Sequence, residues 1–528
     1  MKKITALIVA VFVLGLLGIF ILPTKSDERP NVIFILTDDQ RYDAMGFLNH
    51  ELKTPNIDRM AEEGTYFPNA FVTTALCSPS RATILTSQYM HDHGIVDNNA
   101  GFKKDVIFFP EKLKEAGYKT AFIGKWHMGG LDDSPKPGFD YWLSFPGQGR
   151  YYPTRNEKGE VNSFNINGKR IRQKGYITDE LTQYAIKWMD KIRGKKPFFL
   201  YLSHKAVHAR FSPAPRHRTQ YSNLDIELPS SMEDSAENRA GKPLWVQNQR
   251  NSHHGVEFAY ETSLDITEYK RQYYRALSAV DDSVGELISW LSARGMMENT
   301  IIIFMGDNGF LFGEHGLIDK RHAYEESIRV PLLVYGKGIA KGHTARSLIA
   351  NLDIGPTIID IAKAQTIPQF EGQSFLPMAA GKPAPSDWRS EFFYEYFWEF
   401  NYPQTPTTFA IRSDRYKLIQ YHGIWDRDEL YDLQNDPKET NNLIESRKHL
   451  PIIVELRQKL YKLATNEKGK HVVPYTYKFN QGAVHRYIDG SKSAEFPEDW
   501  ERVGDEADIK DYKIPDENKL SGEGALNH

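Results

Sequence analysis

Asn-Val-Ile-Phe-Ile-Leu-Thr-Asp-Asp, residues 31–39, is a run of apolar residues that ends in two acidic ones. Short runs of this kind, rich in Val, Ile and Phe, are typical of parallel strands that are buried on both faces. Three more runs end in the same way, in polar or charged residues: Lys119 to Ile123, Pro197 to Ser203 and Thr300 to Met305. Because ligands bind beyond the carboxyl ends of the strands in such sheets, the four runs predict one shared site.

The segments between these runs are predicted to be helices. Apolar residues recur at three- and four-residue spacing from Asp265 to Arg294, and shorter helical stretches run from Pro55 to Gly64 and from Pro110 to Gly117. Strands that alternate with helices indicate an α/β fold with a large mixed, mostly parallel sheet flanked by helices. From Asn223 to Thr262 the composition turns polar, which predicts a long inserted loop.

The chain beyond about Pro383 has a different pattern. Its apolar runs are shorter, at Phe409 to Ser413, Lys417 to Tyr421 and Glu429 to Leu433, and a helical stretch lies near Leu450 to Thr465. We therefore expect a small antiparallel sheet that packs with one helix. Since 528 residues exceed one small core, the predicted division is a catalytic domain at 27–380, a C-terminal subdomain at 381–485 and a polar tail at 486–528.

The N-terminal segment, residues 1–26, is predicted to be a targeting segment. Lys2 and Lys3 precede an uncharged apolar run from Ile4 to Leu22, which directs a protein into the export pathway. The run is long enough to span a membrane, so a cleaved signal peptide and a retained membrane anchor both stay open. We expect an exported protein, periplasmic or extracellular, that contacts the membrane only through this segment if the segment is kept.

The composition excludes several classes of protein. Apolar residues make up 40% of the chain, charged residues make up 26%, and the net charge is -3, which argues against a disordered chain and against a nucleic-acid-binding protein. The chain has one cysteine, Cys77, and so cannot form an internal disulfide. A single cysteine in an exported protein is either a reactive group or a small buried side chain.

Two pairs of oxygen-bearing residues follow predicted strands. These are Asp38-Asp39 and Asp307-Asn308. Their side-chain oxygens are the hard ligands that Ca²⁺ and Mg²⁺ prefer. An aspartate after a strand can instead cap the next helix, but two such pairs in one chain favour a metal site.

The segment 76–81, Leu-Cys-Ser-Pro-Ser-Arg, places the single cysteine in the pattern Cys-x-Pro-Ser-Arg, which Leu85-Thr86 follows. At this point the chain resembles the type I sulfatases of the alkaline phosphatase superfamily. The resemblance implies an alkaline phosphatase-like sandwich, and it implies that a formylglycine-generating enzyme oxidises Cys77 to formylglycine (3-oxoalanine). Where the family has Leu-Thr-Gly, this chain has Ser87 in place of the glycine.

Further blocks extend the resemblance from about residue 30 to residue 443. Gly-Lys-Trp-His at 124–127, the block 203–208 with a second histidine, and Asp-Lys-Arg at 319–321 are similar to the family. The resemblance implies one Ca²⁺ ion, with the metal ligands Asp38, Asp39, Cys77 in its oxidised form, Asp307 and Asn308. The catalytic residues that it implies are Cys77, Arg81, Lys125, His127, His208 and Lys320, of which Lys125, His208 and Lys320 also bind the substrate.

These residues make a coherent mechanism. The hydrated aldehyde would attack sulfur in line, while the metal ion and the two lysines balance the charge on the sulfuryl oxygens. His208 is the candidate that protonates the leaving alcohol, His127 is the candidate base of the second step, and Arg81 positions the modified side chain. Taken singly, each lysine would be a surface residue and each histidine a structural one. The match to the family favours catalytic roles for these lysines and histidines instead.

Other residues that look like metal ligands have no place in this mechanism. His91-Asp92-His93 and His253-His254 are expected to lie in loops or in the substrate pocket. Asp281-Asp282 falls within the predicted helix 265–294 and is expected on its solvated face.

The expected substrate is a sulfated mono- or oligosaccharide. The stretches 319–333 and 350–362, together with Asn98-Asn99, look most like sulfatases that act on glucosamine 6-sulfate in heparan-type chains. The alternatives are a sulfatase for another sulfated polysaccharide and a formylglycine-dependent phosphodiester or phosphonate monoester hydrolase. A membrane-anchored carbohydrate-binding protein is the non-enzyme alternative, and the complete catalytic set argues against it.

Overall fold

The computed structural model describes residues 28–464 except 103–104, 156–158, 195, 258–264 and 400–401, and it also describes the strands β19 (Lys470–Thr476) and β20 (Ala483–Tyr487). The predicted targeting segment, residues 1–26, lies outside the described residues, as does the predicted tail beyond residue 487. Within the part of the chain that is described, no helix is both long enough and apolar enough to cross a membrane.

A sheet of ten strands forms the centre of the molecule, in the order β13-β2-β12-β9-β1-β8-β4-β5-β6-β7. The five adjacent strands from β9 to β5 are parallel to one another, and β12 and β6 add antiparallel neighbours on either side. The prediction of a large mixed sheet is therefore confirmed. The strands of this sheet are β1 (Asn31–Thr37), β2 (Thr65–Tyr66), β4 (Lys119–Gly124), β5 (Tyr141–Ser144), β6 (Ser163–Ile166), β7 (Lys169–Arg172), β8 (Phe198–Ser203), β9 (Thr300–Gly306), β12 (Leu332–Gly336) and β13 (His343–Thr344).

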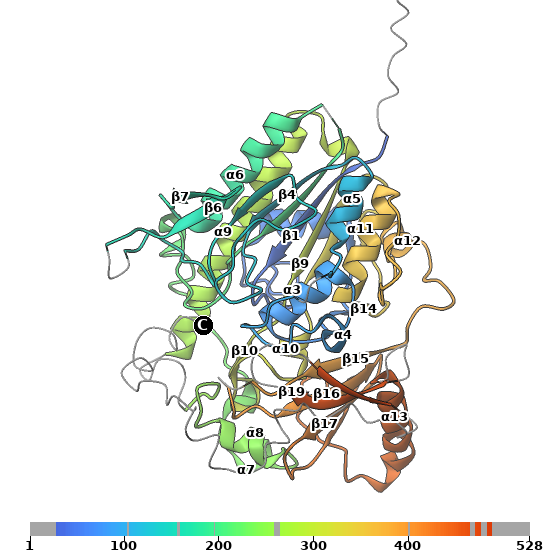
Figure 1. Cartoon of the computed structure of the whole chain (residues 1–528). Helices are drawn as coiled ribbons and strands as arrows, with labels where there is room; N and C mark the ends of the chain where they lie inside the picture. The colour runs from blue at the N-terminus through green and yellow to red at the C-terminus, as the bar shows by residue number, and fades with distance from the viewer. Residues whose placement is uncertain are drawn as a thin grey trace, which may run out of the picture.

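Helices cover both faces of this sheet (Figure 1). Side chains of β1 alternate between two apolar cores: Val32, Phe34 and Leu36 enter one, and Ile33 and Ile35 enter the other. Burial on both faces explains why residues 32–36 of the strand are all apolar. The first core contains α3 (Cys77–Thr86), α5 (Phe109–Glu115), α11 (Ile354–Ala362) and α12 (Leu376–Ala379), and the second contains α2 (Pro55–Glu62), α6 (Ile177–Ile192) and α9 (Ile266–Ser292).

The long helix α9 corresponds closely to the stretch 265–294 predicted from its spacing. Asp265 begins it as a cap, because its carboxylate accepts the N–H groups of Thr267 and Glu268. The prediction that Asp281 lies on a solvated face is wrong. Asp281 is buried and accepts hydrogen bonds from the backbone N–H groups of Asn56 and Ile57, so it satisfies the N-terminus of α2 from a neighbouring helix.

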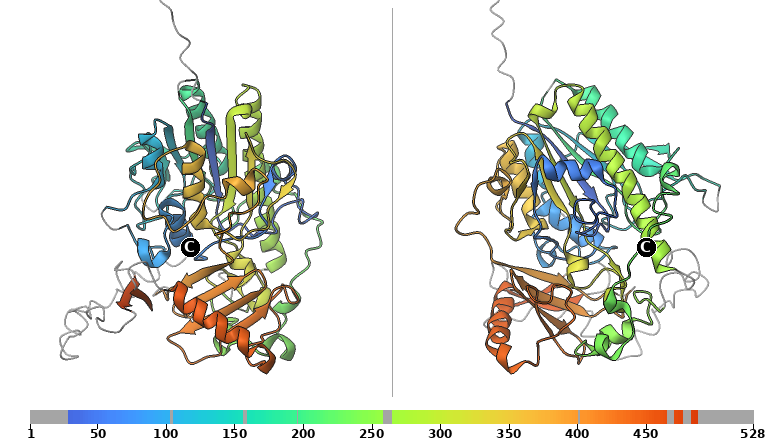
Figure 2. Two further views of the ribbon diagram at one scale, coloured as in Figure 1. Left: turned by 90° about the vertical axis from the view of Figure 1, so that its right-hand side faces the viewer. Right: turned by 180° about the vertical axis from the view of Figure 1, so that it is seen from behind.

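A second, smaller sheet lies at one end of the molecule, beyond the carboxyl ends of the central strands (Figure 2). It consists of the antiparallel strands β15 (Glu391–Tyr396), β16 (Thr407–Ser413), β17 (Tyr416–His422) and β18 (Glu429–Asp432), with α13 (Leu450–Leu463) against it. Phe409 and Leu418 of the sheet pack with Leu456 and Leu460 of the helix. The small antiparallel sheet with one helix is as the sequence predicted, while the domain boundaries stay a prediction.

Buried ion pairs join the small sheet to the rest of the fold. Glu325, in α10 (Glu325–Ile328), contacts Arg412 of β16 and Lys417 of β17, each at 3.1 Å. Lys417 also contacts Glu439 at 2.7 Å. All four side chains are buried, so each charge depends on its partners within the interface.

The polar region 223–262 contains short helices rather than one continuous loop. They are the 3₁₀ turn Ser230–Met232, α7 (Ala236–Arg239) and α8 (Leu244–Gln249). Other short elements include β3 (Ala70–Phe71), α4 (Met90–His93), β10 (Leu311–Phe312), β11 (Ile318–Asp319) and β14 (Ile349–Ala350).

Candidate active site

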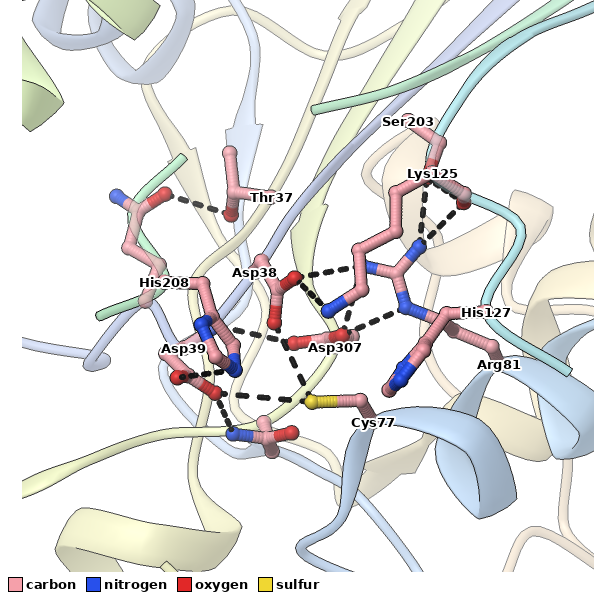
Figure 3. Close-up of polar contacts among 12 residues, drawn as sticks. Thr37, Asp38, Asp39, Cys77, Arg81, Lys125, His127, Ser203, His208 and Asp307 are labelled. Carbon is pink, nitrogen blue, oxygen red and sulfur yellow. Dashed lines mark hydrogen bonds and ion pairs between the residues drawn. The ribbon is translucent and has the colours of Figure 1, made fainter. Parts of the chain in front are cut away.

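The carboxyl ends of β1, β4, β8 and β9 and the first residue of α3 meet at one buried centre (Figure 3). Asp38 and Asp39 follow β1, and Asp307 follows β9, its parallel neighbour in the sheet. Cys77 begins α3 directly after the extended residue Leu76. The four runs that the sequence predicted to share a site do share one.

Three carboxylates form the core of this centre. Oxygens of Asp38, Asp39 and Asp307 lie within 4.8 Å of one another, and all three residues are fully buried. The backbone N–H of Asp39 donates to Oδ1 of Asp307 at 3.0 Å. Asn308 donates through Nδ2 to Oδ1 of Asp39 at 2.7 Å, and its own Oδ1 is buried without a hydrogen-bond partner among the described residues.

This donor set fits a hard divalent cation. Three carboxylates and one amide oxygen without a partner are the ligands that Ca²⁺ or Mg²⁺ takes. Burial, opposed by Lys320 and reinforced by the other two carboxylates, raises the pKa of Asp39 to about 7. Burial and the charge of Asp38 raise the pKa of Asp307 to about 6, although Arg81 opposes them. Asp39 and Asp307 therefore carry more negative charge than their surroundings stabilise, as a cation site should.

Three basic side chains contact the carboxylates. The ammonium of Lys125 contacts Asp38, and Nζ of Lys320 lies 2.8 and 2.7 Å from the two oxygens of Asp39. Burial opposes ionisation of Asp38, but Lys125 and Arg81 outweigh it and lower the pKa of Asp38 to about 2. The two lysines were predicted to contact the sulfate group. They reach the same centre, where their partners in this structure are the carboxylates.

Arg81 connects α3 to the ends of three strands, β4, β8 and β9. Its Nε donates to Oδ2 of Asp307 at 2.8 Å, and its Nη1 donates to the hydroxyl of Ser203 at 2.7 Å and to the backbone oxygen of Lys125 at 2.8 Å. The side chain is one turn along α3 from Cys77. Arg81 thus fixes the orientation of the helix that carries Cys77, which agrees with its predicted positioning role.

The sulfur of Cys77 faces the acidic cluster. It lies 3.4 Å from Oδ1 of Asp38 and 4.0 Å from Oδ1 of Asp39, and the residue is fully buried. An oxygen substituent at this position would lie within coordinating reach of a cation held by the aspartates.

His127 and His208 lie on opposite sides of the Cys77 sulfur (Figure 3). Nδ1 of His208 lies 2.6 Å from the backbone oxygen of Ala209 and therefore carries a proton, which leaves Nε2 toward the cluster, 3.8 Å from Asp39. Nδ1 of His127 lies 3.4 Å from the hydroxyl of Ser78, the residue after Cys77. Both histidines lie beside the centre, and their roles as acid and base stay predictions.

Two adjoining cavities lead to the centre. The small one is lined by Asp39, His208 and Lys320 among others, and the large one, of about 680 Å³, reaches His127. Gln148 and Asn98 line both cavities. The sequence prediction missed Gln148, although a polar residue between two glycines just after a strand of the central sheet was a signal.

The remaining histidine motifs have different positions. His254 is buried with Nε2 3.2 Å from Asp319, which lines the small cavity, so the expected pocket role is compatible with its place. His91 contacts Glu395 of β15 at 2.9 Å and connects α4 to the small sheet. His93 lies 3.1 Å from the hydroxyl of Thr83 in α3. His91 and His93 lie in α4 and line neither of the two cavities, so the prediction of a loop or pocket position is wrong for them.

Comparison with known proteins agrees with this geometry. The family model described as Sulfatase matches residues 30–364, and the one described as N-sulphoglucosamine sulphohydrolase, C-terminal, matches residues 313–466. The protein named N-acetylglucosamine-6-O-sulfatase of Bacteroides thetaiotaomicron is 33% identical over 507 residues, which cover 83% of this chain and 88% of that protein. Human N-acetylglucosamine-6-sulfatase is 33% identical over 421 residues, which cover 74% of this chain and 72% of that protein.

A solved structure shows the same architecture. It is a protein in complex with its substrate D-glucosamine-2-N,6-O-disulfate, is 31% identical, and superposes with a TM-score of 0.75 over 83% of this chain and 97% of that chain. The resemblance noted at the motif around Cys77 thus extends over both parts of the fold. On its sequence, its architecture and its buried acidic centre, this chain belongs to the sulfatase family and is a sulfuric ester hydrolase.

Proposed function

We propose that the protein removes the 6-O-sulfate of glucosamine residues in heparan-type glycans, using formylglycine at position 77 and one Ca²⁺ ion. The observation that carries the proposal is the convergence of Asp38, Asp39, Asp307 and Asn308 on the side chain of Cys77. The choice of sugar is supported by the names of the relatives and by the substrate bound in the solved structure.

The charges of the centre suit an anionic substrate. The centre contains as many basic as acidic side chains, since Arg81, Lys125 and Lys320 face Asp38, Asp39 and Asp307. A divalent cation held by the aspartates and Asn308 would give the centre a net positive charge, and it would stabilise negative charge that develops on the attacking and sulfuryl oxygens. A sulfate ester, which is negatively charged, is then attracted to the site.

The modified residue supplies the nucleophile. As formylglycine, residue 77 would present a hydrated aldehyde, whose hydroxyl attacks sulfur. Arg81 holds α3 through Asp307 and Ser203, and so fixes the direction from which residue 77 approaches the substrate. Lys125 and Lys320 face the same space and balance charge on the sulfuryl oxygens.

The two histidines move protons on opposite sides of residue 77. His208 directs Nε2 toward the cluster, because its Nδ1–H is held by the backbone oxygen of Ala209. Nε2 must first take up a second proton beside the anionic sulfate ester, and the imidazolium then gives that proton to the leaving sugar oxygen. His127, beside Ser78, accepts the proton that must leave residue 77 when sulfate is expelled and the aldehyde forms again.

Maturation and export are part of the proposal. A formylglycine-generating enzyme would convert Cys77, and the apolar run from Ile4 to Leu22 would direct the protein to the periplasm or the exterior. Mass spectrometry of the peptide that contains Cys77 measures the conversion. An unmodified thiol throughout an active preparation would contradict it.

The substrate is tested with purified protein that carries formylglycine. We expect release of sulfate from glucosamine 6-sulfate and from heparan-type oligosaccharides with this group. Sulfated galactose, uronic acid and fucose serve as matched controls, and an aryl phosphodiester and a phosphonate monoester test the alternative chemistry. Cleavage confined to the other sugars would remove the glucosamine assignment, and faster cleavage of the phosphorus esters would favour the alternative hydrolase.

A further inference from the structure

The loop Pro146–Arg150 carries one polar side chain into the route between the two cavities. It follows β5 and contains Gly147 and Gly149, whose φ angles are 53° and 68°. A Cβ atom on Gly149 would lie 2.4 Å from the ring of Phe145. Glycine is therefore required there by both conformation and space, and the loop holds Gln148 in a defined position.

The side-chain amide of Gln148 differs from the amides of Gln173 and Asn98, which line the same cavity, in having no hydrogen-bond partner among the described residues. Both Nε2 and Oε1 are buried, and neither has a hydrogen-bond partner among the described residues. Gln173, which also lines the large cavity, donates to three backbone oxygens and accepts from Asn162. Asn98 accepts the N–H of Ser78 at 3.1 Å. A buried amide without partners is costly, so its presence calls for a partner that binds from outside the protein.

The position of Gln148 identifies that partner as part of the substrate. Gln148 borders the small cavity with Asp39, His208 and Lys320, and it also borders the large cavity that reaches His127. A sugar whose sulfate group lies at residue 77 would have its ring next to this junction. The group of the sugar that meets Gln148 belongs to the residue that carries the sulfate ester.

We propose that Gln148 is a substrate-recognition residue whose amide makes hydrogen bonds to a hydroxyl of the sulfated sugar ring. The inference rests on the proposed function and adds to it a residue that distinguishes a sugar from another sulfate ester. An amide offers one donor group and one acceptor group, and a hydroxyl can use both. A second anionic group would leave Oε1 of Gln148 facing negative charge, so a neutral hydroxyl is the better match.

The test compares two substrates in the variant Gln148→Ala. On glucosamine 6-sulfate, we expect kcat/KM to fall about 10- to 100-fold, because a hydrogen bond to the sugar is lost. On 4-nitrophenyl sulfate, which has no ring hydroxyl, we expect a change below about threefold. Gln148→Glu keeps the shape and removes the donor, so it should show the same selective loss. Gln183→Ala, at an exposed position of α6, is the matched control and should leave both rates unchanged.

A binding measurement separates recognition from chemistry. In a Cys77→Ala background, which has no nucleophile, calorimetry with glucosamine 6-sulfate should show weaker binding when Gln148→Ala is added. Equal losses on both substrates, or no loss on the sugar, would overturn the inference while leaving the proposed function intact. A parent protein that is inactive on glucosamine 6-sulfate would instead refute the proposed substrate. In that case the affinity of the Gln148→Ala variant is measured for a sulfated sugar that the parent protein does bind. Equal affinity of the two proteins for that sugar would overturn the inference.

Discussion

At the scale of single residues, Ser87 shows how this chain departs from the family pattern without losing the nucleophile helix. Ser87 ends α3 in the left-handed conformation, with φ 54°, where glycine is the usual residue. Its hydroxyl donates to the backbone oxygen of Leu352 at 2.6 Å and accepts the N–H of Gly372 at 3.2 Å. These bonds compensate for the strain of a side chain at positive φ.

We predict that Ser87→Ala destabilises the protein by about 1–2 kcal/mol, because the strain stays and the hydroxyl bonds are lost. Ser87→Gly should cost less, since it relieves the strain as it removes the bonds. Urea denaturation of both variants measures the difference. A glycine variant less stable than the alanine variant would show that the positive φ carries no strain.

Asn308 gives the second prediction at this scale. Its side-chain oxygen, Oδ1, is buried and has no hydrogen-bond partner among the described residues. We expect a chelator to abolish activity and Ca²⁺ to restore it, and Asn308→Ala to raise the Ca²⁺ concentration required by at least about tenfold. Thermal shifts measured against added Ca²⁺ report binding independently of activity. Asn435→Ala, an exposed asparagine, is the control and should leave the requirement unchanged.

At the scale of helices and strands, the sequence predicted most of what positions the site. The runs that form β1, β4, β8 and β9 could be recognised because each contains an apolar stretch that polar residues follow, and burial on both faces imposes that pattern. Asp281 could not be placed in the same way. Its partner is the N-terminus of a helix more than two hundred residues earlier, and helical spacing carries no information about such a neighbour.

Gln148 was missed for a related reason. Its significance lies in the hydrogen bonds that it does not make, and only the packed fold reveals them. The acidic pairs could be found because a metal site needs several oxygens at once, whereas a single amide in a loop has no such signature.

The contact between α4 and β15 gives a prediction about pH. Burial lowers the pKa of His91, but the Glu395 carboxylate outweighs it and raises the pKa from 6.5 to about 9. Protonated His91 therefore stabilises the fold fully below pH 6.5, and this contribution is lost as the pH rises through about 9. Burial and Asp92 also raise the pKa of the neighbouring Glu371 to about 8, and this group acts in the same direction.

We expect the free energy of unfolding to decrease from pH 6.5 to pH 9, and His91→Gln to flatten this decrease. The variant should be less stable than the parent protein near neutral pH and should approach it in alkali. Denaturant unfolding at a series of pH values provides the measurement. Parallel pH profiles for the two proteins would contradict the assignment to His91.

At the scale of the whole molecule, the charged interface around Glu325 determines how the small sheet stays attached. Lys417 contacts both Glu325 and Glu439 and is fully buried. Lys417→Met would leave buried carboxylates without this cation, and we expect a loss of about 3–5 kcal/mol in the free energy of unfolding. Lys459→Met removes partly exposed ion pairs with Glu391 and Glu455 and should cost less than about 1 kcal/mol. Similar losses of stability in the two variants would mean that burial does not strengthen the ion pairs of Lys417.

The complete burial of Cys77 has a consequence for the order in which folding and modification of this residue can occur. In the folded chain its side chain is 0% exposed, at the start of α3, a helix whose residues are all buried. An enzyme that modifies Cys77 must reach its side chain, and in the folded chain that side chain is out of reach. Under the proposed conversion of Cys77, modification therefore competes with folding, and we expect a molecule that folds first to stay inactive when the modifying enzyme is added later.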